Sequence, residues 1–274
     1  MPELPEVETI VRTLRPHVLQ RKVSQVRLQR RESLEPSSLP LEQLCGSTCT
    51  AVSRRGKLIL FGFDSGLTLA VHLRMTGALL VQDHIAPGRY CRCIFTLQES
   101  TGKTSWLFFD DIRCFGTLLL TDQKGLGAFP YLATLGPEPL SLQFSDFVSI
   151  LSLHKEAQIK AVLLNQRVIA GIGNIYADES LFSARLLPTR SVKSLHTNEY
   201  RALYTSITEV LNKALAQMGT SFRNYQDANG HPGRFQNTLA VYGKAGQPCP
   251  RCGSPLQKSR VAGRGTVFCS NCQH

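Results

Sequence analysis

The chain has 274 residues, enough to bury a substantial core in one large domain or, as we prefer, two joined domains. Its formal net charge is +11, from 31 Lys and Arg against 20 Asp and Glu, which exceeds what an enzyme of neutral substrates needs. A phosphate backbone is the commonest partner for such a surplus, with a merely basic surface as an equal alternative at this point. No apolar run is long enough to cross a bilayer, and the acidic start MPELPEVETI is unlike a signal peptide. We therefore expect an intracellular protein that does not bind membranes.

The first half of the chain predicts one helix followed by strands. Apolar residues recur at helical spacing from Pro5 to about Leu19, with Pro5 suited to a first turn. Residues 22–122 then consist of short segments rich in Val, Ile, Leu and Phe, such as KLILFGF and GTLLLTD, separated by Gly, Asp and Ser. This pattern predicts an antiparallel sandwich or barrel of about eight strands.

The second half predicts helices. Three prolines in residues 128–140 indicate an interdomain linker. Beyond the linker the apolar spacing becomes helical, and we expect helices near residues 143–153, 157–168, 174–186 and 197–218. Residues 219–235 are polar, contain Gly and Asn, and form too long a stretch for a simple connection. A functional lid and an ordinary surface loop are both open interpretations of this segment.

The last residues carry a metal-binding pattern. Of the nine cysteines, four form two Cys-x-x-Cys pairs separated by sixteen residues, a spacing typical of a four-thiolate Zn²⁺ site. Two disulfides are the alternative, which the odd cysteine total and a reducing compartment disfavour. Lys258, Arg260 and Arg264 make the intervening hairpin basic, which favours a nucleic-acid contact. We expect one structural Zn²⁺, held by Cys249, Cys252, Cys269 and Cys272.

Seven motifs together resemble a known family. They are PELPEVET at the start, RRGK at 54–57, HLRMTG at 72–77, DIRCFG at 111–116, LGPEPL at 135–140, GIGNIYADE at 171–179 and GRGTVFCSNCQ at the end. In this order, from Pro2 to Gln273, they resemble the formamidopyrimidine-DNA glycosylases. The resemblance implies an α+β fold, with an N-terminal β-sandwich behind a leading helix and a helical domain containing a helix-two-turn-helix and a zinc ribbon. The expected parts are a catalytic sandwich at 2–127, the linker at 128–140, the helical domain with its lid loop at 141–236, and the ribbon at 237–274.

The resemblance also implies an activity. The expected enzyme is a monomer that excises oxidised purines, namely 8-oxoguanine and formamidopyrimidines, from double-stranded DNA and then nicks the strand by β,δ-elimination. In a bacterium it would be cytoplasmic and associated with the nucleoid. One alternative is an endonuclease VIII-type glycosylase that prefers oxidised pyrimidines. The other is a non-catalytic zinc-ribbon protein that only binds DNA.

Four residues match the family's catalytic set. The nucleophile would be the amine of Pro2 after loss of Met1, because an α-amine with a pKa of about 7.7–8.0 stays neutral far more often than a lysine near 10.4. Glu3 would be the acid that protonates the sugar ring oxygen, and Lys57 and Arg264 would contact the phosphates beside the lesion. Without the resemblance, Pro2 reads as an ordinary helix-leading proline, and Lys57 as a solvated lysine at a strand end. Glu6 is a second nearby carboxylate for which capping the helix is an equally good role.

The resemblance assigns DNA contacts as well. Because a damaged base must leave the duplex, Met75, Arg113 and Phe115 are expected to enter the vacated space and the adjacent stack. The alternative for Met75 and Phe115 is a place in the core, and Cys114 between Arg113 and Phe115 departs from the family pattern. Lys160 matches a lysine near the lesion, and backbone amides around Thr220 to Tyr225 are expected to close over the extruded purine. By the same resemblance, His72, Asn174 and Tyr242 are expected to contact the DNA backbone.

Overall fold

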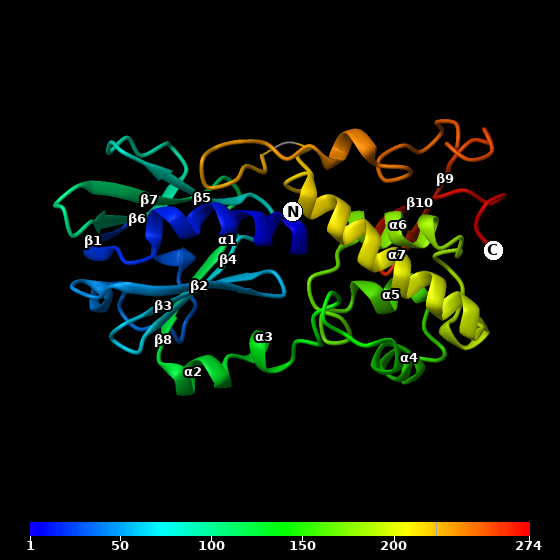
Figure 1. Ribbon diagram of the computed structural model, residues 1–274, viewed down its shortest axis with the longest axis horizontal. Coiled ribbons are helices and arrows are strands. Elements are labelled where there is room, and N and C mark those ends of the chain that lie inside the picture. The colour runs from blue at the N-terminus through cyan, green and yellow to red at the C-terminus, as the bar shows by residue number, and fades with distance from the viewer. Residues whose placement is uncertain (223) are drawn as a thin grey trace. The chain divides into compact units, whose positions relative to one another are not determined.

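The computed structural model describes residues 1–222 and 224–274, which form two compact units (Figure 1). The sheet unit contains residues 1–133 and 217–234, and the helical unit contains residues 134–216 and 235–274. The predicted boundaries assign residues 217–234 to the helical domain. In the structure this segment packs within the sheet unit, because its contacts are made with the first helix and with strands.

The sheet unit contains helix α1 and two four-stranded antiparallel sheets, which confirms the predicted eight-stranded sandwich (Figure 1). One sheet has the strand order β1-β6-β7-β5 and the other β2-β3-β4-β8. The bounds are α1 Leu4–Val18, β1 Lys22–Leu28, β2 Cys49–Arg55, β3 Leu58–Phe63, β4 Thr68–His72, β5 Gly77–Gln82, β6 Cys91–Gln98, β7 Thr104–Asp111 and β8 Thr117–Thr121.

The core of the sheet unit forms around α1. Its apolar face, including Val7 and Leu14, is fully buried and shares one hydrophobic cluster with residues of both sheets, such as Phe61 and Phe109. Burying large apolar side chains in this way is the main stabilising contribution to such a unit. The helix begins at Leu4, so the first residues of the chain are fixed directly beside this core.

The helical unit contains four helices and a β-hairpin, as predicted. The bounds are α4 Phe144–Ser152, α5 Ile159–Leu164, α6 Asn174–Ser183, α7 Thr197–Ala216, β9 Gln257–Val261 and β10 Arg264–Phe268. Helix α5 is shorter than the expected 157–168. The chain turns after Leu164 because Gln166 hydrogen-bonds the main chain of Leu164, Gly171 and Ile172, which replaces the bonds of a longer helix.

Two short helices lie in the predicted linker, residues 128–140, or directly before it. They are α2, Gln123–Ala128, and α3, Pro130–Ala133. Asp122 accepts a hydrogen bond from Gly125 N and caps α2, while Pro130 occupies the first position of α3, where a missing N–H costs nothing. The 3₁₀ segments are Arg31–Ser33, Leu41–Leu44, Val192–Ser194 and Phe235–Thr238. Within the described ranges, no helix combines the length and apolar character needed to cross a membrane.

Candidate active site and nucleic-acid interface

The start of the chain is organised by two buried carboxylates. Glu3 is 2% exposed and Glu6 is 1% exposed, and Pro2 is buried in the chain that still carries Met1. Glu6 Oε2 accepts a hydrogen bond from Glu3 N at 2.8 Å, with Pro5 in the first helical turn. This confirms the capping role of Glu6 and fixes the backbone of Glu3.

The second oxygen of Glu6 reaches a distant part of the sequence. Glu6 Oε1 accepts a hydrogen bond from Thr220 N at 2.7 Å, across a separation of 214 residues. Gly219 precedes it with a φ of +78°, and a Cβ built there would lie 2.8 Å from Glu6 Oε1. Only glycine fits this approach. One carboxylate therefore joins the N-terminus to the segment 217–234, a link that the sequence pattern did not indicate.

The segment 217–234 is anchored at several points within the sheet unit. Ala228 N donates to Thr13 Oγ1 of α1, and Ala228 O accepts from Val81 N of β5. Ser221 Oγ donates to Tyr225 O and accepts from Gly233 N. Phe222 nevertheless remains 52% exposed. The expected amide contacts from Thr220 to Tyr225 include Arg223, which lies outside the described residues.

Lys57 and His72 are brought together by strand pairing. Lys57 occupies the turn between β2 and β3, the strands on which α1 packs, and it is 5% exposed. The next residue, Leu58, pairs with His72 on β4. Burial, followed by the positive charges of Arg74 and Lys57, lowers the pKa of His72 to about 3. His72 Nδ1 accepts a hydrogen bond from Arg74 N at 3.0 Å, so the neutral ring carries its proton on Nε2 and is a donor there.

The three residues expected to enter the duplex lie together on two loops, 73–76 and 112–116, which we call the insertion loops. Arg113 Nη1 lies 3.2 Å from Met75 Sδ, and the Arg113 guanidinium lies 4.8 Å from the centroid of the Phe115 ring. Met75 is 40% exposed and Phe115 is 51% exposed. The alternative that they are core residues is therefore wrong. Ile112, which the sequence pattern did not single out, adds a further exposed apolar side chain.

In the helical unit, Lys160 is fully buried. Its Nζ donates to Thr266 Oγ1 at 2.7 Å and to Gly265 O at 3.1 Å, and it forms an ion pair with Asp178 Oδ1 at 2.7 Å. Burial raises the pKa of the equally buried Asp178 to about 6, against the lowering effect of the Lys160 charge. The ion pair therefore holds the residues that follow Arg264, and the ammonium group itself is not on the surface.

Two more residues of the GIGNIYADE motif, Asn174 and Glu179, bind the main chain of Gly265 and of residues 240–242. Asn174, the first residue of α6, donates from Nδ2 to Gly265 O at 3.0 Å. The buried Glu179 carboxylate accepts the backbone N–H groups of Ala240, Val241 and Tyr242 at 2.8–2.9 Å. Neither Asp178 nor Glu179 was predicted as a site residue. The sequence signal was the adjacent acidic pair in this motif, and the structure adds that residues 175–182 are all buried.

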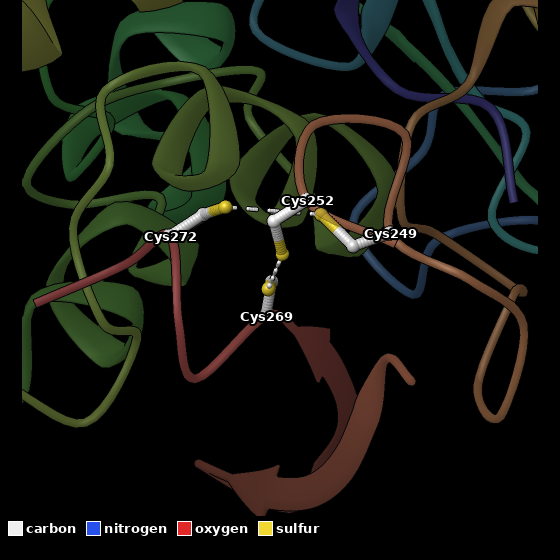
Figure 2. A group of neighbouring side chains, drawn as sticks. All are labelled: Cys249, Cys252, Cys269 and Cys272. Atoms are coloured by element: carbon white, nitrogen blue, oxygen red, sulfur yellow. Dashed lines mark hydrogen bonds between the residues drawn. The ribbon is translucent and has the colours of Figure 1, made fainter. Parts of the chain in front are cut away.

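The four cysteines converge at one point beside the β9–β10 hairpin (Figure 2). Their Sγ atoms lie within 4.8 Å of one another, with Cys252 to Cys269 at 3.5 Å and Cys249 to Cys272 at 3.9 Å. Tetrahedral Zn²⁺ with bonds of about 2.3 Å requires sulfur separations of about 3.8 Å. The thiolates therefore fit a single structural zinc ion, and four protein ligands leave no position for a substrate.

The hairpin beside the cysteines presents basic side chains. Lys258, Arg260 and Arg264 are all exposed. Ala262 and Gly263 form the tight turn, with φ values of 48° and 72°. The turn conformation fits a two-residue hairpin loop. It places Arg264 at the first position of β10, opposite Val261.

Three family profiles cover most of the chain. They are the formamidopyrimidine-DNA glycosylase N-terminal domain at residues 1–118, the formamidopyrimidine-DNA glycosylase H2TH domain at 135–226, and the zinc finger found in FPG and IleRS at 246–274. The formamidopyrimidine-DNA glycosylase of Desulfitobacterium hafniense is 42% identical over 278 residues, with all of both chains covered. That of Thermus thermophilus is 43% identical over 276 residues, covering 100% of this chain and 98% of the relative.

Solved structures agree with these relatives. The crystal structure of the MutM (Fpg) protein of Thermus thermophilus matches with a TM-score of 0.88 at 42% identity, covering 99% of this chain and 98% of the other. A mutant Lactococcus lactis Fpg in complex with DNA containing Fapy-dG matches with a TM-score of 0.88 at 35% identity, with both chains fully covered. The chain therefore belongs to the formamidopyrimidine-DNA glycosylase family, whose motifs it carries from its first residues to its last.

Proposed function

We propose that this glycosylase excises oxidised purines, 8-oxoguanine and formamidopyrimidines, from duplex DNA and then cuts the strand through a covalent intermediate on Pro2. The observation that carries the proposal is the buried start of the chain, where Pro2 and Glu3 precede α1 and Glu6 fixes the Glu3 backbone. The Lactococcus lactis relatives crystallised with DNA containing Fapy-dG and with DNA containing an abasic site support the choice of substrate.

The proposed chemistry requires removal of Met1, which frees the secondary amine of Pro2. The amine nitrogen attacks the anomeric carbon of the damaged nucleotide, the bond from that carbon to the base breaks, and the base leaves with a proton. Glu3 protonates the sugar ring oxygen as the ring opens, which leaves a cationic iminium. Because this iminium draws electrons, the neighbouring sugar carbon loses a proton and the 3′ phosphate departs. A second elimination releases the 5′ phosphate, and hydrolysis of the iminium by water releases the sugar remnant and regenerates the amine of Pro2.

The proposed DNA contacts involve both exposed and buried side chains. We propose that Met75, Arg113 and Phe115 fill the space left by the extruded base. Arg264 on the basic hairpin and neutral His72, as an Nε2 donor, contact phosphates together with Lys57, Asn174 and Tyr242. Lys160 acts on the lesion side through Gly265 and Thr266, to which its ammonium group is bonded. The segment 217–234 covers the extruded purine.

We also propose an oligomeric state and a cellular location. The enzyme acts as a monomer on double-stranded DNA, in the cytoplasm of a bacterial cell at the nucleoid, since the relatives described above are bacterial proteins.

The decisive experiment is borohydride trapping on a duplex with a single 8-oxoguanine opposite cytosine. Reduction of the iminium gives a stable protein–DNA adduct, and peptide mass spectrometry then locates its attachment, which we expect at Pro2. The matched control is the same duplex with guanine at the lesion position. No adduct with processed, zinc-loaded protein would overturn the lyase mechanism, and an intact strand after long incubation would support binding alone. Faster release of thymine glycol than of 8-oxoguanine would favour the endonuclease VIII-type alternative.

A further inference from the structure

A buried carboxylate lies beneath the insertion loops. Asp111, the last residue of β7, is 0% exposed and directly precedes the loop that carries Arg113 and Phe115. We infer that Asp111 is a positioning residue that holds both insertion loops in the arrangement needed to enter the duplex. The inference rests on the insertion role proposed above for Met75, Arg113 and Phe115.

The carboxylate connects the two loops directly. Asp111 Oδ1 accepts hydrogen bonds from Thr76 Oγ1 at 2.5 Å and from Arg113 N at 3.2 Å. Its other oxygen, Oδ2, accepts from Gly116 N at 2.7 Å. Thr76 Oγ1 in turn accepts from Arg113 N at 3.0 Å. Thr76 is the neighbour of Met75, so the contacts of one side chain fix the backbone on both sides of the exposed cluster.

An ionised aspartate suits this position better than any neutral side chain of the same size. All three groups that face it are donors, and a carboxylate offers only acceptors. An asparagine would direct an NH₂ group at one of these donors and leave the donor unpaired in a buried place. The main chain of Asp111 is fixed too, because its carbonyl oxygen accepts from Arg92 Nε at 2.8 Å and from Arg92 Nη2 at 2.5 Å.

The loops need such a restraint because their backbone is strained and tightly packed. Arg74 and Cys114, which are not glycines, have φ values of 51° and 57°. A Cβ on Gly116 would lie 2.7 Å from Phe109 Cζ and 3.2 Å from Asp111 Oδ2. Left-handed conformations of ordinary residues persist only where surrounding contacts impose them. The contacts of Asp111, together with the bond from Arg113 N to Thr76 Oγ1, connect the two loops.

The side chains proposed to enter the duplex are already in contact with one another in the protein without DNA. Arg113 contacts Met75 and lies over the Phe115 ring although all three side chains are on the surface. Side chains ordered in advance lose less conformational entropy when they enter the base stack. Asp111 thus serves insertion without touching the DNA.

The test compares Asp111→Asn with Asp110→Asn. Asp110 is the preceding residue on the same strand, is only partly buried, and interacts with Cys91 rather than with the insertion loops. Single-turnover base release is measured on a duplex with 8-oxoguanine opposite cytosine. Borohydride trapping is measured on a single-stranded abasic oligonucleotide, where no stacked partner base has to be displaced. We expect Asp111→Asn to slow release from the duplex roughly 10- to 100-fold, with trapping on the single strand within about threefold of wild type.

A spectroscopic readout separates this inference from the insertion proposal itself. With 2-aminopurine opposite the lesion, wild type is expected to raise its fluorescence as the partner base loses stacking, and Asp111→Asn to give a smaller rise. No rise with wild type would refute the insertion proposal. A full rise with Asp111→Asn would refute only the role of Asp111.

The remaining outcomes are equally decisive. Equal losses on duplex and single strand, or an equal loss with Asp110→Asn, would mean a general structural effect and would overturn the inference. Thr76→Val removes one donor to the carboxylate and keeps the side-chain shape, so it supplies the test if Asp111→Asn fails to fold. We expect it to show the same substrate selectivity with a smaller loss.

Discussion

The insertion loops of the sheet unit and the β9–β10 hairpin of the helical unit present cationic side chains by different means. Beneath the loops, Asp111 accepts only neutral N–H and O–H donors through its carboxylate. Behind the hairpin, Asp178 forms an ion pair with Lys160 and also accepts from Val267 N, and the hairpin further depends on four cysteines. The first arrangement uses hydrogen bonds to neutral donors alone, whereas the second depends on charge balance and on a metal ion. The hairpin is therefore expected to be the more easily disrupted.

Removal of zinc gives the largest expected effect. The hydrophobic cluster behind the ribbon is small and includes two of the zinc ligands, so residues 246–274 should lose their fold under a chelator or in Cys269→Ser. Hydrogen exchange of β9 and β10 should become fast, and DNA affinity should fall roughly tenfold or more as the hairpin's phosphate contacts are lost.

Two controls test whether the effect is confined to the helical unit. The sole tryptophan, Trp106, lies in the sheet unit, so its fluorescence should not change. Cys45→Ser, at an exposed cysteine, is the control. Protected β9–β10 amides after zinc loss would contradict this expectation.

Breaking the buried ion pair comes next. Lys160→Met leaves Asp178 buried without its cation, which should cost about 3–5 kcal/mol in the free energy of unfolding of the helical unit. The double variant Lys160→Met with Asp178→Asn removes both charges and should recover part of the loss. Circular dichroism during denaturant unfolding measures both effects. If the losses of stability in Lys160→Met and in Asp178→Asn simply add in the double variant, the two side chains do not stabilise the hairpin as an ion pair.

The same pair predicts a dependence on pH. Because burial raises the pKa of Asp178 from 3.8 to about 6, the folded protein binds more protons than the unfolded chain between these values. The Asp178 contribution to the free energy of unfolding should therefore fall, by at most about 3 kcal/mol, as pH rises from about 4 to about 6, and stay constant above that range. The difference between wild type and Asp178→Asn across this window isolates the effect. A difference that does not vary with pH would contradict the prediction.

The smallest expected effect concerns a single phosphate contact. Arg264→Ala should reduce the slope of log affinity for duplex DNA against log salt concentration by about 0.9, the value for one phosphate. Fluorescence anisotropy at several salt concentrations measures it. Arg260→Ala, exposed on the same hairpin, is the matched control and should change the slope less. Equal changes would mean that the hairpin attracts DNA by its total charge alone.

Sequence patterns predicted the regular elements and the metal site well. Apolar periodicity located α1 and the long helix α7, and the apolar segments indicated about eight strands within residues 22–122, because burial of one face imposes a regular spacing. The zinc ligands were recognisable because their spacing alone brings the thiols together. Helices α2 and α3 were missed because Gly127 and Pro130, which usually end helices, occur within or beside them.

The missed parts of the site share one property. Glu6 with Thr220, Asp111 with Thr76, and Glu179 with residues 240–242 join segments that are far apart in the sequence. In each case a side chain meets a group whose place is set by the tertiary fold, and in most cases that group is a backbone N–H. Every residue except proline has a backbone N–H group. The amino-acid sequence therefore does not show which of these groups a distant side chain will bind.

The division of the chain has a consequence for how the protein is made. The sheet unit ends its first stretch at residue 133 and is completed only by residues 217–234, after most of the helical unit. On a ribosome, α1 therefore emerges long before Thr220, whose N–H the Glu6 carboxylate accepts. Contacts of such long sequence separation form late and slowly. The Glu6 carboxylate therefore cannot form this link until residues 217–234 have been synthesised.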